Sequence, residues 1–176
     1  FDDRQVQHIR PLRSRARVEA LCAAIIRSNH QLSATSPDSE NENQLDKVLR
    51  DCISTAGHDY LVCIISDFAG ATAQTLQLLR QLSAHNDVIA LQVYDPLALN
   101  IPDAGRLMVT QGQLQVELDV DRRQVHRPLS EFLSGRLQEV AQMLRRSQVP
   151  LMMINTGEDA LEQLRRELGR LSGGAQ

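Results

Sequence analysis

Two aspartates stand just after apolar runs whose lengths suit β-strands. Asp67 follows the run Tyr60–Ile65, and Asp95 follows the run Val88–Tyr94. In open parallel sheets, ligands bind beyond the carboxyl ends of the strands, and carboxylate oxygens are the ligands that Mg²⁺ prefers. An aspartate at this place also commonly closes the turn that follows the strand. Residue chemistry alone favours turn closure over metal binding.

The other residues that could do chemistry do not combine into a catalytic set. The 5 histidines lack the spacing of metal ligands, and the sequence contains no GxSxG, Walker-type or GxGxxG motif. Cys22, Cys52 and Cys63 match no zinc or CxxC pattern. Because they fall on apolar helix faces or in an apolar run, we expect buried, reduced thiols, which suits the cytoplasm.

Length and charge bound the function classes. A chain of 176 residues makes one domain, residues 1–176. A net charge of −3 is too small to indicate nucleic-acid or membrane binding by bulk electrostatics. The sequence has neither an apolar run near 18 residues nor a signal-peptide pattern, so we expect a soluble, cytoplasmic chain without membrane contact.

Hydrophobic periodicity predicts the elements that position the two aspartates. Helical spacing predicts helices from Ser14, at Leu45–Ile53, Thr72–His85 and Pro128–Ser147, and from Asp159 onward. Strands are predicted at Val6–Pro11, Tyr60–Ile65, Val88–Tyr94 and Val149–Ile154, and a β-hairpin at 106–120 around Gln111-Gly112. The Gly-rich end, residues 173–176, should fray.

These elements predict an α/β fold. The run Tyr60–Ile65 is apolar at every position, as in a parallel strand buried on both faces. Strand, helix, strand from residue 60 to residue 94 forms one right-handed crossover unit. We therefore expect a Rossmann-like, mostly parallel sheet with helices on both faces and an inserted β-hairpin.

Five short strings, taken in order, carry a resemblance. They are His8–Ser14 (HIRPLRS), Asn29–Leu32 (NHQL), Ile64–Phe68 (IISDF), His85–Ala90 (HNDVIA) and Tyr94–Leu97 (YDPL). Together they resemble the second half of the bacterial family called domain of unknown function 58. That family's fold is similar to the von Willebrand factor A domain.

The resemblance implies a metal-ion-dependent adhesion site. Asp67 matches its late acidic ligand, and Thr35 is a candidate for its threonine element. The Asp-x-Ser-x-Ser motif that supplies most ligands is absent from the sequence, so the chain looks as if it begins after the first strand and first helix of the domain. We expect no cofactor in this chain. Bound Mg²⁺ is expected only in a longer protein, and so are any segments that anchor it to a membrane.

The resemblance also implies a function. It indicates a non-enzymatic protein-interaction module that acts with a MoxR-type AAA+ ATPase in a chaperone-like or maturation assembly. The expected docking face is Asp67, Phe68 and Asp95, with Phe68 either an apolar anchor or part of the core. The alternatives are a small Mg²⁺-dependent phosphoryl-handling enzyme that uses Asp67 and Asp95, and a scaffold without any ligand.

Without the first strand, one edge of Tyr60–Ile65 would lack a hydrogen-bond partner. Unpaired edges recruit other strands, and each unmade buried backbone bond costs on the order of 1–3 kcal/mol. We therefore expect either that the N-terminal segment pairs with Tyr60–Ile65, or that two chains associate there.

Overall fold

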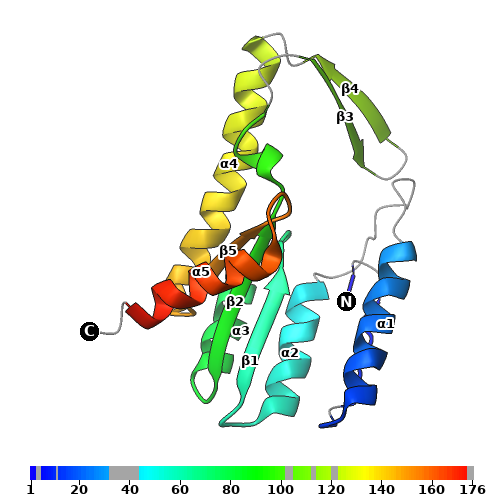
Figure 1. Cartoon of the computed structure of the whole chain (residues 1–176). Helices are drawn as coiled ribbons and strands as arrows, with labels where there is room; N and C mark the ends of the chain where they lie inside the picture. The colour runs from blue at the N-terminus through cyan, green and yellow to red at the C-terminus, as the bar shows by residue number, and fades with distance from the viewer. Residues whose placement is uncertain are drawn as a thin grey trace.

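The computed structural model describes residues 1–2, 5–10, 12–31, 44–101, 105–111, 114–119 and 123–173 (Figure 1). The helices are α1 Arg15–Gln31, α2 Gln44–Ala56, α3 Ala73–Ser83, α4 Arg123–Arg146 and α5 Ala160–Gly173, with a short 3-10 helix, η1, at Pro96–Ala98. The strands are β1 Leu61–Ser66, β2 Asp87–Tyr94, β3 Arg106–Gln111, β4 Leu114–Asp119 and β5 Leu151–Asn155.

The predicted α/β fold is confirmed. Three strands form a parallel sheet in the order β1-β2-β5, in which Ile64 pairs with Ala90 and Ala90 pairs with Leu151. The predicted hairpin is present as the antiparallel pair β3-β4, and it stands apart from the parallel sheet (Figure 1). Its expected turn residue Gly112, the residues 174–176 and Thr35 lie outside the described residues.

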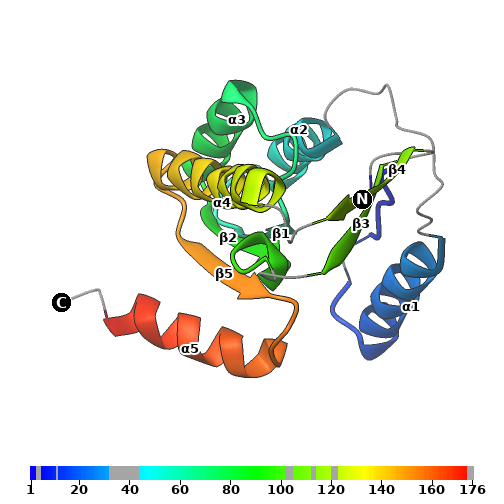
Figure 2. The same cartoon turned by 90° about the horizontal axis from the view of Figure 1, so that it is seen from above.

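Helices cover both faces of the parallel sheet, as expected. Helices α2, α3 and α4 lie on one face and α5 lies on the other (Figure 2). The larger core fills the first face, and its buried members include Leu49, Ile64, Leu79, Ala90 and Leu144. A smaller core between the sheet and α5 contains Leu91, Met152 and Ile154. Among the described residues, no helix is long and apolar enough to cross a membrane.

The predicted strand at Val6–Pro11 is wrong over the described residues 5–10, which form no strand. Gln7 and Ile9 instead line a cavity of about 310 Å³ together with Leu21 and Ile25 of α1. A strand exists only where its backbone finds a ladder partner, and this segment lies along α1 instead of the sheet. The predicted start of α1 is confirmed, since Ser14 Oγ accepts a hydrogen bond from the Arg17 N–H at 3.3 Å.

Burial of β1 on both faces is also wrong. Ile64 is buried on the face covered by α2, α3 and α4, whereas Leu61 and Ile65, on the opposite face, are 68% and 62% exposed. Helix α5 packs on β5, and no described helix covers this outer face of β1. Cys63 lies on the same face and is exposed, as is Cys22 on α1. The expectation of buried thiols is therefore wrong for these two cysteines, and Cys52 is only partly buried.

One edge of β1 is open as well. The Tyr60 carbonyl accepts from the Asp87 N–H at 2.9 Å, so even-numbered residues of β1 face β2 in the parallel ladder. The backbone groups of Leu61, Cys63 and Ile65 therefore point away from the sheet. Among the described residues, nothing pairs with them, and the described N-terminal segment does not supply a partner strand.

We therefore predict that the chain self-associates through β1. The substitution Ile65→Glu places a charge on the exposed apolar face and should convert associated chains to monomers, because charges on edge strands oppose pairing. Light scattering after size exclusion measures the mass. The matched control is Phe132→Glu on α4, since Phe132 is comparably exposed at 65%. A wild-type monomer with rapid amide exchange at residues 61–65 would contradict the prediction.

Alkylation of Cys63 gives a second readout of this association. Although Cys63 is exposed, the partial desolvation of its thiol raises the thiol pKa, so its alkylation rate should rise at a higher pH than that of an ordinary thiol. In a Cys22→Ser/Cys52→Ser background, Ile65→Glu should nevertheless speed alkylation at fixed pH. The new carboxylate raises the thiol pKa further, so a faster reaction can only report greater exposure.

Candidate functional site

The carboxyl ends of the three parallel strands meet at one edge of the sheet. β1 and β2 are neighbours, and they end at Ser66 and Tyr94. This places Asp67 and Asp95 on the same edge from adjacent strands, as predicted. Because Tyr94 pairs with Asn155, the end of β5 adds an amide to the same edge.

Each strand ends in the same kind of turn. Asp67 Oδ1 accepts from the Ala69 N–H at 3.0 Å, Asp95 Oδ1 from the Leu97 N–H at 2.8 Å, and Asn155 Oδ1 from the Gly157 N–H at 2.9 Å. Side chains of Asp and Asn close turns in this way, two residues further on. The turn-closing role favoured by residue chemistry is thus confirmed, and the two aspartates remain exposed.

Sequence reasoning missed Asn155. The signal was available, since Asn155 follows the apolar run Val149–Ile154 and precedes Gly157 by two residues. Its amide also donates to Glu158 Oε1 at 3.0 Å. This hydrogen bond, followed by the ion pair with Arg166, holds the pKa of the Glu158 carboxyl below its ordinary value.

Phe68 lies in the core, which corrects the hypothesis that it is a surface anchor. The residue is 0% exposed, and its φ of 55° lies in the left-handed region that bulky residues rarely adopt. The Phe68 N–H donates to Ser66 Oγ at 3.0 Å, and burial of the ring holds the unfavourable backbone in place. Exposed apolar side chains at the strand ends include Ile65 in β1, and Leu97 and Leu99 just after β2.

A buried pair that the sequence did not indicate fixes the helices beside the Asp67 turn. The Thr75 hydroxyl donates to Asp46 Oδ1 at 2.5 Å, and Thr75 Oγ1 accepts from the Thr72 N–H at 2.9 Å. Both Asp46 and Thr75 are buried. Since a buried carboxylate is costly without hydrogen bonds, this contact ties the start of α2 to the start of α3.

The described residues do not complete a Mg²⁺ site. The described part of the chain holds no group of 3 or more His, Cys, Asp or Glu side chains that could bind a metal ion. Asp67 and Asp95 each use one carboxylate oxygen in a turn. Hard cations take about six oxygen ligands, so two aspartates from neighbouring turns supply too few.

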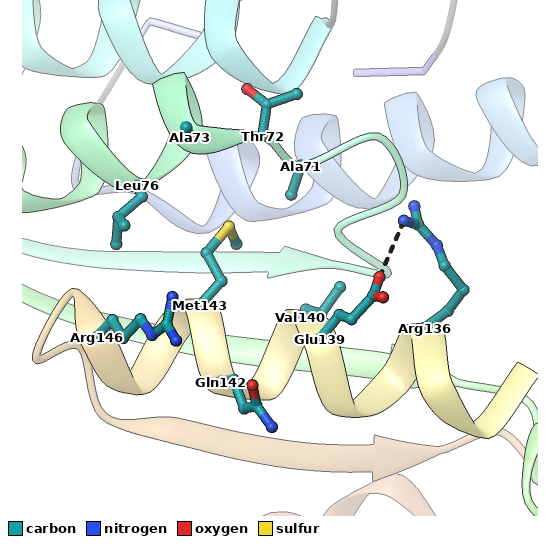
Figure 3. Close-up of a pocket in the computed structure, with 10 residues that line it drawn as sticks. All are labelled: Ala71, Thr72, Ala73, Leu76, Arg136, Glu139, Val140, Gln142, Met143 and Arg146. Carbon is teal, nitrogen blue, oxygen red and sulfur yellow. Dashed lines mark hydrogen bonds and ion pairs between the residues drawn. The ribbon is translucent and has the colours of Figure 1, made fainter.

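A groove opens beside this edge, between the start of α3 and the second half of α4 (Figure 3). It has a volume of about 360 Å³, and its apolar wall includes Ala71, Leu76 and Met143. The ion pair of Arg136 with Glu139, at 3.4 Å, stands on one rim. The Thr72 hydroxyl accepts from the Gln74 N–H as the helix cap, so the groove offers apolar contact instead of a nucleophile paired with a base.

Two buried glutamines differ in their hydrogen bonding. Gln92, in the central strand, is 0% exposed, and its two amide atoms have no partner among the described residues. Gln163, on α5, is 1% exposed. Its Oε1 accepts from the Asn155 N–H at 2.9 Å, and its Nε2 donates to the Asn155 carbonyl at 2.8 Å.

The fold and the strand-end turns define an α/β protein whose parallel sheet carries two fixed, exposed aspartates at its carboxyl edge. A family model described as protein of unknown function DUF58 matches residues 1–140. The chain therefore belongs to the DUF58 family, which confirms the resemblance. Comparison with curated proteins and with solved structures finds no significant match.

The two glutamines lead to opposite predictions for one substitution. Gln92→Met should raise the free energy of unfolding by about 1–2 kcal/mol, because it removes an unsatisfied buried amide while keeping its shape. Gln163→Met should lower it by about 1–3 kcal/mol, because it orphans the backbone groups of Asn155. Urea unfolding measures both values. A destabilising Gln92→Met would show that the Gln92 amide finds a partner in solution.

Proposed function

We propose that this chain is a non-enzymatic protein-interaction module of the von Willebrand factor A type. It works with a MoxR-type AAA+ ATPase in a chaperone-like or maturation assembly. The observation that supports the proposal is the pair of exposed carboxylates, Asp67 and Asp95, at the ends of adjacent strands. Membership of the DUF58 family supports it as well.

The two carboxylates are suited to bind a cationic partner surface. In each, Oδ1 accepts a backbone N–H, while no described group donates to Oδ2. The turns fix the position of the charge, so little side-chain entropy is lost when a partner arginine or lysine binds Oδ2. Leu97 and Leu99, which are 44% and 46% exposed, supply apolar contact beside Asp95.

The proposal predicts the effect of removing each charge. Asp67→Asn and Asp95→Asn keep the Oδ1 acceptor that closes the turn, so the melting temperature should stay unchanged. Each should weaken binding of the MoxR-type ATPase about tenfold, equivalent to about 1.4 kcal/mol. Surface plasmon resonance with the purified ATPase measures the affinity.

A matched control uses the same strand. Asp87 is exposed and begins β2, so it lies at the opposite end of this strand from Asp95. Asp87→Asn should therefore leave the affinity unchanged. ATPase binding that survives both Asp67→Asn and Asp95→Asn at full strength would argue against this docking face.

The same site predicts weak or undetectable Mg²⁺ binding by this chain, since two turn-bound aspartates leave most of the coordination shell to water. Isothermal titration calorimetry with MgCl₂ should show no saturable micromolar site. The phosphoryl-handling alternative depends on that ion. A micromolar Mg²⁺ site, with Mg²⁺-dependent hydrolysis of p-nitrophenyl phosphate lost in Asp67→Asn, would favour the enzyme over the interaction module.

A further inference from the structure

β5 forms the second open edge of the parallel sheet, opposite β1. The Ala90 N–H donates to the Pro150 carbonyl and the Thr156 N–H donates to the Tyr94 carbonyl, so even-numbered residues of this segment face β2. The backbone groups of Leu151, Met153 and Asn155 therefore point outward. They form a row of donors and acceptors along the edge.

The end of this row, at Asn155, is already paired with a side-chain amide, and this pairing shows which hydrogen bonds the edge can make. The side-chain amide of Gln163 accepts from the Asn155 N–H and donates to the Asn155 carbonyl. A residue of a neighbouring antiparallel strand would make the same two contacts through its own C=O and N–H. Among the described residues, nothing continues this pattern along Met153 and Leu151.

A groove of about 460 Å³ runs along the unfilled part of the edge. Tyr94, Leu151 and Met153 line it from the sheet, and its sides are lined by Arg145 of α4 and by several residues of α5. These two helices lie on opposite faces of the sheet, so the groove follows the strand edge between them (Figure 2). An extended peptide is the shape that such a groove accommodates.

The charges along the groove favour an acidic peptide. Its lining includes Arg145, Arg166 and Arg170 against Glu158 and Glu167. Arg166 pairs with Glu158 at 3.2 Å, and Arg170 pairs with Glu167 at 2.5 Å. The side chain of Arg145, in the last turn of α4, has no ion pair among the described residues. This leaves one positive charge for a carboxylate.

We propose that the groove binds an extended peptide that adds to β5 as a further strand, with an acidic side chain beside Arg145. Backbone hydrogen bonds to Leu151 and Met153 hold the peptide, as in other cases of strand addition, and the amide of Gln163 ends the row. The surface is independent of Asp67 and Asp95. It also differs from the β1 edge, which borders the exposed apolar Leu61 and Ile65.

The probe is a fluorescein-labelled octapeptide of alternating valine and glutamate. A second octapeptide, with lysine in place of each glutamate, serves for comparison. Fluorescence polarisation should show at least tenfold tighter binding of the glutamate peptide to the wild-type chain. Met153→Pro removes an outward N–H that makes no ladder bond, a position where edge strands tolerate proline. It should weaken binding at least tenfold with an unchanged circular dichroism spectrum.

The matched control is Cys63→Pro, which removes the corresponding outward N–H from the β1 edge and should leave the peptide affinity unchanged. Amide exchange should slow at Leu151 and Met153 on adding the glutamate peptide. Binding that survives Met153→Pro, or slower exchange at Cys63 and Ile65 instead, would overturn the proposal.

Arg145→Glu tests the charge without touching the backbone. It should weaken binding of the glutamate peptide and strengthen binding of the lysine peptide, each about tenfold. This reversal remains measurable even if Met153→Pro fails to fold. Arg127→Glu, at an exposed residue in the first half of α4, is its control and should change neither affinity. Equal effects of the two arginine variants would contradict the proposed groove.

Discussion

The parallel sheet depends on the backbone pairing of β2, the strand in its middle. Alternate residues of β2 face β1 and β5, so every ladder bond of both outer strands ends on this one segment. The same strand supplies both cores, through Ala90 to the larger and Leu91 to the smaller. Among the described strands of this sheet, β2 alone is paired on both sides. Each outer strand keeps a row of outward backbone groups that no described strand pairs, although Gln163 caps the row of β5 at Asn155.

The carboxyl edge combines exposed charge with a rigid backbone. Three side chains close the turns after β1, β2 and β5 by the same hydrogen bond, and the buried Phe68 holds the first turn from below. The Asp46–Thr75 contact ties α2, which precedes β1, to α3, which follows the first turn. The carboxylates of Asp67 and Asp95 are thus held in position by the backbone N–H groups of their own turns. Such an edge suits recognition of a preformed surface.

The sequence predicted the element types well because apolar spacing differs between helices and strands. It could not predict what covers each apolar surface. The run Tyr60–Ile65 reads as buried on both faces, yet no described helix covers its outer face, and the apolar stripe of α1, which includes Val18 and Ile25, is exposed too. The strand expected at Val6–Pro11 failed for a related reason, since alternation identifies residues that could pair without identifying the partner.

At the candidate site, the sequence identified Asp67 and Asp95, because an aspartate after an apolar run has only a few roles. The buried Phe68, the pair Asp46–Thr75 and the capped edge at Asn155 depend on contacts between residues far apart in the chain. Gln163 shows the limit best. On a helical wheel it is one polar residue among several. Only its place beside Asn155, the last residue of β5, lets its amide make the two hydrogen bonds that a neighbouring strand would make.

The two open edges of the sheet differ in chemistry, and that difference keeps their uses separate. β1 borders an apolar face, where exposed Leu61, Cys63 and Ile65 favour contact with another apolar surface. β5 borders a polar groove with an unpaired Arg145. Because the edges lie on opposite sides of β2, a strand added at β1 leaves the groove at β5 open. The predicted association at β1 and the proposed peptide groove at β5 are therefore compatible within one sheet.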